Sequence, residues 1–183
     1  MVKYFENTTR HPIISSNGMV SSAHPLASNV GAKILMNGGN AFDAAVGVAF
    51  ALGVVEPYMS GPGGIGLALI TKSGVNTPEV LNFSGLAPKL ATPDNFKDIE
   101  NSVSFNGISN NVGIKAGMVP GNLAGWFELY NKYGSVDLAM VMEPAIHYAE
   151  NGFPVSKFCH ETIKQSVPIL SKYPSSNIFL GNS

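Results

Sequence analysis

One stretch of the chain, residues 41–55, restricts the possible folds more than any other part of the sequence. It reads AFDAAVGVAFALGVV, so a helix here would be apolar or small on nearly every side, and Asp43 is its one charged residue. A helix of this kind has to be covered all round. The stretch is too short for a membrane span, which needs roughly 20 residues. We therefore expect a buried helix whose small residues let neighbouring elements approach closely.

The residues around this helix predict where it begins and what precedes it. Asn40 is typical of an N-cap, and Asp43 three positions later can accept hydrogen bonds from the first free amides. An earlier helix is predicted from Pro25, a residue favoured at the first helical position, to the glycine pair at 38–39.

The remaining pattern mixes strands with helices. Two hairpins are predicted, one over residues 12–22 around Asn17-Gly18 and one that pairs residues 67–70 with 80–83. Residues 88–112 are rich in Pro, Asn, Ser and Asp, which indicates loops. Further helices are expected from Pro120 to Gly134 with a stripe of Leu123, Trp126, Phe127 and Tyr130, over residues 138–151, and from near Ser156. Because regular strand-helix-strand alternation is missing, the pattern favours an α+β fold.

Composition excludes several classes of protein. Of 183 residues, 45% are hydrophobic and 13% charged, which is too apolar for a disordered chain. A net charge of −1 provides no basic surface for nucleic acid or for an anionic membrane. The single cysteine, Cys159, cannot close an internal disulfide. The first residues lack a signal-peptide core, so we expect a cytoplasmic protein.

No complete catalytic constellation is visible from the residues alone. Gly61-x-Gly63-x-x-Gly66 matches a dinucleotide-binding pattern, but here a helix precedes it and a strand follows, which predicts a tight turn instead. The four histidines show no metal-ligand spacing, and no cofactor or metal is implied. A lone cysteine in an apolar helix is usually a core residue, so we expect Cys159 to be structural.

Two carboxylates lie beside the most apolar stretch, where burial can raise a pKa enough for acid–base chemistry. Capping explains Asp43 more simply. Glu56 ends the helix before Pro57, and we expect it to accept hydrogen bonds from a neighbouring loop. Neither residue is predicted to be catalytic.

Several segments together resemble the amino-terminal part of the large subunit of the γ-glutamyltranspeptidase family, a family of N-terminal nucleophile hydrolases. Their order and spacing match from about residue 10 to residue 155. The segments are GMVSSAHPLAS (18–28), GGNAFDAA (38–45), ALGVVEPYMSGPGG (51–64), VPGNLAGW (119–126), KYG (132–134), PAI (144–146) and AENGFPV (149–155).

The resemblance implies part of a four-layer αββα fold. It also implies a proenzyme that cleaves itself and exposes a threonine, which attacks a γ-glutamyl amide and gives an acyl-enzyme. That threonine is not in this chain, so no catalytic residue is assigned here. The implied partners are the remainder of the large subunit, the small subunit that carries the nucleophile and a small-molecule amide substrate. We expect residues 1–183 to be the amino-terminal segment and not a complete domain.

One position departs from the family pattern. Where relatives carry Asp-Phe-Arg-Glu-x-Ala-Pro, residues 82–88 read NFSGLAP, so Ser84 stands in the place of an arginine that clamps the substrate carboxylate. A hydroxyl has neither the charge nor the two-pronged geometry of a guanidinium. Ser84 is therefore either a substrate-binding residue at this position or a plain strand residue. Arg10, the only arginine of the chain, is interpreted as structural. The resemblance thus leaves open γ-glutamyl transfer, an acylase with a non-glutamyl substrate, and a non-catalytic relic or binding domain.

Overall fold

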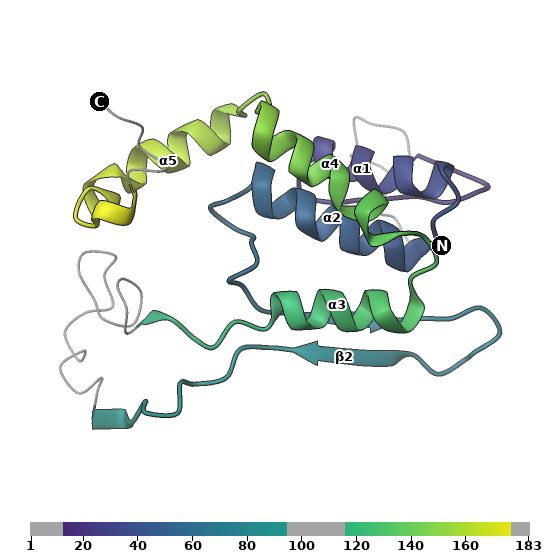
Figure 1. The fold of residues 1–183 in the computed structure, drawn as a ribbon, viewed down its shortest axis with the longest axis horizontal. Coiled ribbons are helices and arrows are strands. Elements are labelled where there is room, and N and C mark those ends of the chain that lie inside the picture. Colours follow the sequence, from purple (N-terminus) through teal and green to yellow (C-terminus); the bar gives the residue numbers. More distant parts are fainter. Residues whose placement is uncertain (1–12, 95–115, 177–183) are drawn as a thin grey trace, which may run out of the picture.

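The computed structural model describes residues 13–94 and 116–176. Helix α2 (Ala41–Val55) lies at the centre and contacts α1 (Pro25–Met36), α3 (Asn122–Tyr133) and α4 (Leu138–Asn151). Figure 1 shows α3 between this helical group and a two-stranded hairpin. Among the described residues the chain is therefore a mixed α+β structure in which helix α3 covers one face of a two-stranded sheet.

Helix α2 is capped as the sequence predicts. The Asn40 side chain accepts from the amides of Phe42 and Asp43 at 2.8 and 3.0 Å, and the Asp43 carboxylate accepts from the Asn40 amide at 2.8 Å. Every residue of α2 except Ala41 and Ala45 is at least partly buried. The prediction of a helix covered on nearly all sides is confirmed.

Small residues bring α1 and α2 together. A Cβ at Gly31 of α1 would lie 2.7 Å from the Val48 side chain, and one at Gly47 of α2 would overlap Ile34. Helix α1 ends as expected at the glycine pair, because Gly38 has a φ of 92° and the Gly39 amide donates to the Ile34 carbonyl at 3.0 Å. The close approach predicted for α2 therefore occurs at its contact with α1.

The predicted hairpin over residues 12–22 is wrong for the residues that the structure describes. The Ser15 hydroxyl accepts from the amides of Asn17 and Gly18, which makes a local turn without paired strands. Ile13 and Ile14 are exposed, while Val20 packs against Gly31 of α1. The segment gains more by covering α1 than by pairing with itself, because its apolar residues do not alternate onto one buried face.

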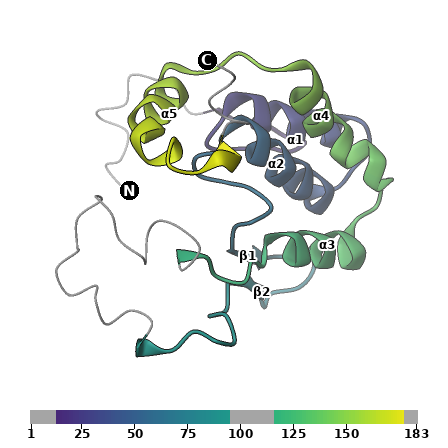
Figure 2. The ribbon, with the colours of Figure 1, turned by 60° about the vertical axis from the view of Figure 1, so that its left-hand side comes forward.

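The second hairpin forms as predicted. Strand β1 (Gly66–Ile70) pairs antiparallel with β2 (Glu79–Phe83), with Gly66 opposite Phe83 and Ile70 opposite Glu79. Figure 2 shows both strands beside α3. The face of the hairpin turned away from α3 carries Leu67, Leu69 and Val80, which are 62 to 73% exposed. One sheet face is thus packed and the other is open and apolar.

The buried face of α3 is shifted by about one residue from the apolar stripe that the sequence predicts. The buried residues are Asn122, Gly125, Trp126 and Leu129, whereas Leu123 is 40% exposed. The shift has one polar and one steric cause. The Asn122 side chain hydrogen-bonds to the turn before β1, and Gly125 lies against the Phe83 ring. The helix begins at Asn122 and stops before Gly134, close to the predicted ends.

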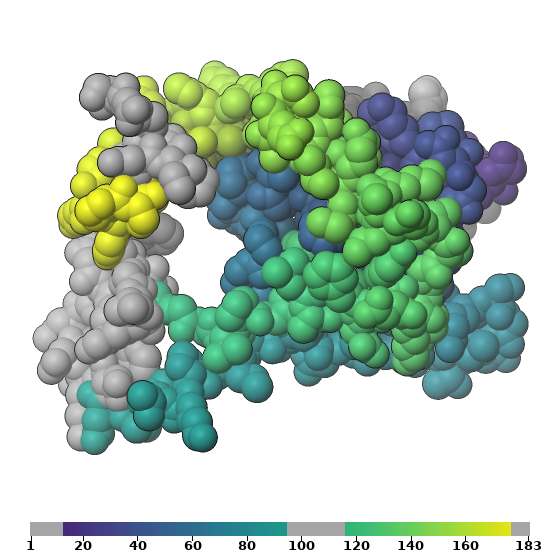
Figure 3. Space-filling view, in the orientation of Figure 1, coloured from purple at the N-terminus to yellow at the C-terminus, as the bar shows by residue number. Residues whose placement is uncertain are grey.

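The carboxyl-terminal helices lie where they were expected. Helix α4 begins after Asp137, whose side chain caps it, and α5 (Lys157–Leu170) begins after Ser156. A short 3₁₀ turn, Pro174–Ser176, follows. Figure 3 shows α5 standing out from the body that the other helices form. The predicted loop over 88–112 lies mostly outside the described residues.

Candidate functional site

Ser84 comes directly after β2, at the end of the hairpin where Phe83 pairs with Gly66. Ser84 is exposed, and its amide donates to the Asn82 side-chain oxygen at 3.0 Å. This local bond turns the chain out of the strand. The residue that sequence comparison singled out is therefore presented at a strand end, where a side chain can reach solvent or a ligand.

Two other segments meet the chain around Ser84. The Val119 amide donates to the Leu86 carbonyl at 2.9 Å, which joins residues 116–122 to residues 82–88. The amides of Gly121 and Asn122 both donate to the Gly64 carbonyl at 3.0 Å, which adds the glycine-rich turn at 61–66. We call these three segments the Ser84 site.

The glycine-rich turn of this site is held by α3. Asn122 donates from its side-chain amide to the Gly61 carbonyl at 2.7 Å, and the Gly64 amide closes the turn on the same carbonyl at 3.0 Å. A Cβ at Gly64 would approach the Asn122 amide nitrogen within 2.5 Å. The turn follows a helix and precedes a strand, so the prediction of a packed turn is confirmed. The Gly64 amide and the carbonyls of Gly61 and Gly64 are therefore used inside the protein.

The side chains at the Ser84 site are mainly apolar. A Cβ at Gly85 would lie 2.7 Å from both Ile65 and Met118, and Leu86 is 72% exposed beside them. None of the three segments contains a lysine or an arginine. The three segments therefore offer contact for an apolar group and contain no cation for a carboxylate, with Lys89 and Lys115 standing directly beyond two of them in the sequence. The hairpin register alone places Ile65 near residue 84, whereas nothing in the sequence signals the approach of Met118.

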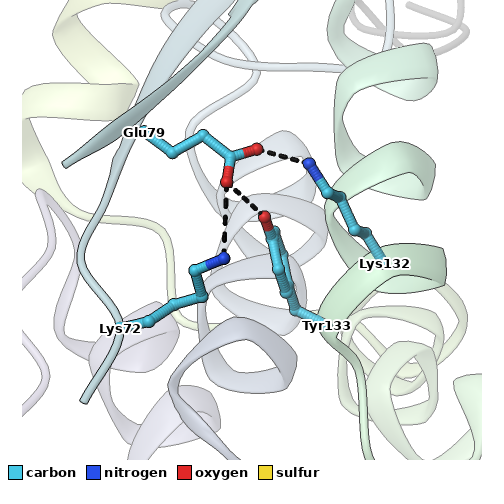
Figure 4. A network of polar contacts seen from close by, with 4 residues as sticks. All are labelled: Lys72, Glu79, Lys132 and Tyr133. Atoms are coloured by element: carbon cyan, nitrogen blue, oxygen red, sulfur yellow. Dashed lines mark hydrogen bonds and ion pairs between the residues drawn. The ribbon is translucent and has the colours of Figure 1, made fainter. Parts of the chain in front are cut away.

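A charged network holds the opposite end of the hairpin (Figure 4). The Glu79 carboxylate accepts from Lys132 and from the Tyr133 hydroxyl, the latter at 2.6 Å, and Lys72 lies 3.6 Å away. Lys132, followed by Tyr133, lowers the pKa of Glu79 to about 2. The hydrogen bond to Glu79, followed by that to Tyr133, raises the pKa of Lys132. The ring of Phe42 in α2 stacks on the ring of Tyr133, with their centroids 4.6 Å apart, so the network connects the strands to both α3 and α2. Its contacts are those of a structural clip.

The other candidates from the sequence take structural places. Asp43 is fully buried and, besides its capping role, accepts from the Ser135 amide and hydroxyl. Cys159 is buried on α5, and burial, then the nearby Glu56, raises the pKa of its thiol. Glu56 is 8% exposed and accepts a long bond from the Tyr58 hydroxyl, a loop residue, as expected.

Neither metal-ligand nor membrane features appear in the described part of the chain. Within residues 13–94 and 116–176, no three His, Cys, Asp or Glu side chains gather closely enough to hold a metal ion. No helix in those ranges has the length and apolarity to cross a membrane. Arg10 and His11 lie outside the described residues.

Comparison with known proteins decides the family. The family model for gamma-glutamyltranspeptidase matches residues 27–183. The chain belongs to the gamma-glutamyltranspeptidase family. It is 38% identical to the glutathione hydrolase proenzyme of Bacillus subtilis over 169 residues, which cover 92% of the chain and 29% of that relative. It is 40% identical to the acylase ACY 1 proenzyme of Pseudomonas sp. strain V22, with 90% of the chain and 30% of the relative covered.

Solved structures of the gamma-glutamyltranspeptidase family show the same fold. The chain superposes on Helicobacter pylori gamma-glutamyltranspeptidase with a TM-score of 0.82 and 40% identity, over 91% of this chain and 47% of the other. The predicted family and the predicted α+β N-terminal nucleophile hydrolase fold are therefore confirmed. The chain spans less than a third of the length of the two curated relatives named above.

Proposed function

We propose that this chain is the amino-terminal segment of a gamma-glutamyltranspeptidase-family enzyme that transfers or hydrolyses an acyl group. In this proposal a threonine outside the chain attacks an amide carbonyl, and its own amine takes the proton and returns it to the leaving amine. Water or a second amine then resolves the ester. The family membership and the placement of the Ser84 site at a strand end support this role.

The contribution of this chain would be one wall of the acyl-donor pocket. The open face of the hairpin, with Leu67, Leu69 and Val80, would be covered by the remainder of the large subunit and by the small subunit. Exposed apolar area of this kind favours association with another sheet or helix layer. Residues 1–183 would then depend on the rest of the protein for a complete core.

Denaturing mass spectrometry of the protein expressed from its full gene tests whether the family chemistry is present. We expect two subunits, the smaller with a threonine at its new amino terminus. A single uncleaved species without amidase activity would exclude the proposed enzymatic function and support the alternative of a non-catalytic relic or binding domain.

A second candidate concerns the acyl group. The absence of any basic residue from the Ser84 site favours an acylase whose donor is not recognised through a γ-glutamyl carboxylate. The apolar side chains of Ile65, Leu86 and Met118 supply contact for an apolar acyl chain. Similarity to the acylase ACY 1 proenzyme is consistent with this choice.

Three anilides separate the two candidates. γ-Glutamyl anilide carries an α-carboxylate and an amine, glutaryl anilide lacks the amine, and butyryl anilide lacks both groups. An enzyme without a carboxylate clamp should hydrolyse butyryl anilide with a kcat/KM at least equal to that for the other two. A preference for both carboxylate-bearing donors by more than about 30-fold, or about 2 kcal/mol, would instead indicate a clamp supplied elsewhere.

Substitution of Ser84 tests its position directly. We expect Ser84→Arg to raise kcat/KM for γ-glutamyl anilide relative to butyryl anilide by about 30-fold, because the guanidinium adds a charge and a bidentate donor. Ser84→Gln adds similar length without charge and should leave the ratio nearly unchanged. Equal effects of both variants would show that Ser84 does not face the acyl chain.

A further inference from the structure

A cavity lies where α1 begins, α2 ends and α5 begins. Its volume is about 830 Å³, within the range of ligand-sized pockets. Its lining includes His24, Leu26, Glu56, Tyr58, Met59 and Phe158. Glu56 is the only carboxylate among the described residues of the lining.

The Glu56 carboxylate is buried without adequate compensation. Its side chain accepts one long bond, 3.4 Å from the Tyr58 hydroxyl, although an ionised carboxylate can accept about four. In residues 13–94 and 116–176 no lysine or histidine forms an ion pair with it. No buried side-chain oxygen in that part of the chain is cut off from both partner and solvent. The second oxygen of Glu56 is therefore reached by solvent, and Glu56 lines the cavity.

The walls of the cavity are suited to the methylene chain of a lysine or arginine side chain. Tyr58 and Phe158 meet edge to face with ring centroids 5.6 Å apart, and Leu26 adds apolar surface. Aromatic faces attract ammonium and guanidinium groups, and a long methylene stem packs well on apolar side chains. His24 accepts from the Leu26 amide at Nδ1, at 3.2 Å, and it forms no ion pair with Glu56. Burial, followed by the nearby Glu56 carboxylate, raises the pKa of both the Tyr58 hydroxyl and the Cys159 thiol.

We infer that this cavity receives the side chain of an arginine or lysine from a part of the protein outside residues 13–94 and 116–176, and that its charge pairs with Glu56. Buried carboxylates in proteins are normally paired, and the described residues supply no cation here. The curated relatives are about three times as long as the matched region, so a covering segment is available. Met59 and Phe158, which are 78% and 68% exposed, would be covered by the same segment.

The structure of the full-length protein is the direct test. We expect an arginine or lysine nitrogen within about 4 Å of a Glu56 carboxylate oxygen, with its stem between Leu26 and Phe158. A cavity filled only by water, by a neutral side chain or by a bound small molecule would overturn the inference. This result is independent of catalysis, so an inactive protein would still decide it.

Stability measurements on the full-length protein give a second test. Glu56→Gln keeps the shape but removes the charge, and it should lower the thermal midpoint by about 5 °C because a buried cation loses its partner. The matched control Glu128→Gln, on the exposed side of α3, should change the midpoint by less than about 1 °C. Equal midpoints for Glu56→Gln and wild type would contradict the pairing.

A double-mutant cycle then identifies the pair itself. The basic residue seen at Glu56 is replaced by methionine, alone and together with Glu56→Gln. The double variant should be more stable than the sum of the two single losses implies, because neither charge is left without its partner. Strict additivity would mean that the two side chains do not interact and would overturn the inference.

Discussion

Asp43 joins two parts of the chain that are 92 residues apart. Its carboxylate is fully buried and accepts from the Asn40 amide, the Ser135 amide and the Ser135 hydroxyl. Because all of these partners donate, Asp43→Asn would place an amide nitrogen against a donor. We expect it to reduce the free energy of unfolding by about 2 kcal/mol, measured from the urea midpoint of the full-length protein.

Asp137 is the matched control for Asp43. It caps α4 through one bond to the Ala139 amide at 2.9 Å and is exposed. Asn caps helices as well as Asp, so Asp137→Asn should change the midpoint little. If the two variants were equally stable, the bonds to Ser135 would contribute nothing measurable.

The sequence predicts the role of Asp43 only in part. The spacing of Asn40 and Asp43 predicts a cap, since both partners lie within one helical turn. The bonds to Ser135 depend on where packing places the loop that follows α3, and no local sequence pattern contains that information. Ser84 is also predictable only in part. Its position in the family motif can be found from the sequence, but its apolar neighbours come from other segments.

At the scale of elements, α3 packs against β2 through a glycine. A Cβ at Gly125 would overlap the Phe83 ring. Alanine is the better helix former by about 1 kcal/mol, so a free helix would gain from Gly125→Ala. We expect the overlap to dominate and to reduce the free energy of unfolding by about 1 to 3 kcal/mol, measured by urea denaturation.

The sign of the Gly125→Ala effect is itself the test. Phe83→Leu should reduce the loss, because the smaller side chain makes room for the new methyl group. The opposite exchange at the exposed neighbour, Ala124→Gly, measures helix propensity alone. Stabilisation by Gly125→Ala would contradict the close contact between α3 and β2.

The clip around Glu79 predicts a pH dependence. The pKa of Glu79 falls to about 2 in the folded protein, from an ordinary value of 4.5. Its stabilising contribution is therefore complete above about pH 4.5 and is lost as the pH falls through about 2. The thermal midpoint of wild type should exceed that of Glu79→Gln at pH 6 and converge with it toward pH 2. A constant gap between the two would contradict the clip, and Glu128→Gln is the control.

Predictability differs between the elements for physical reasons. The helices were readable because caps, glycine stops and apolar spacing agree within each segment. The segment 13–22 carries an Asn-Gly signal but no alternating pattern, and packing on α1 decided its conformation. A short turn signal without a buried strand face is therefore weak evidence for a hairpin.

At the scale of the whole molecule, the open face of the hairpin governs how residues 1–183 behave alone. Leu67, Leu69 and Val80 form an exposed apolar surface on a two-stranded sheet, which is marginally stable by itself. We expect the isolated chain to self-associate and to bind a hydrophobic dye, and Leu69→Lys to reduce both. A monomer with a sharp, reversible thermal transition would contradict this expectation.

The bond between Ser135 and Asp43 also fixes the order in which the molecule can open. The Ser135 amide lies in a loop between α3 and α4, where amides normally exchange their protons with solvent quickly. Here it donates at 3.0 Å to a carboxylate that solvent does not reach. Although Ser135 is exposed, we expect its amide to exchange mainly when the α3–α4 connection moves away from α2. This loop amide should therefore be more protected than the other amides of the same loop.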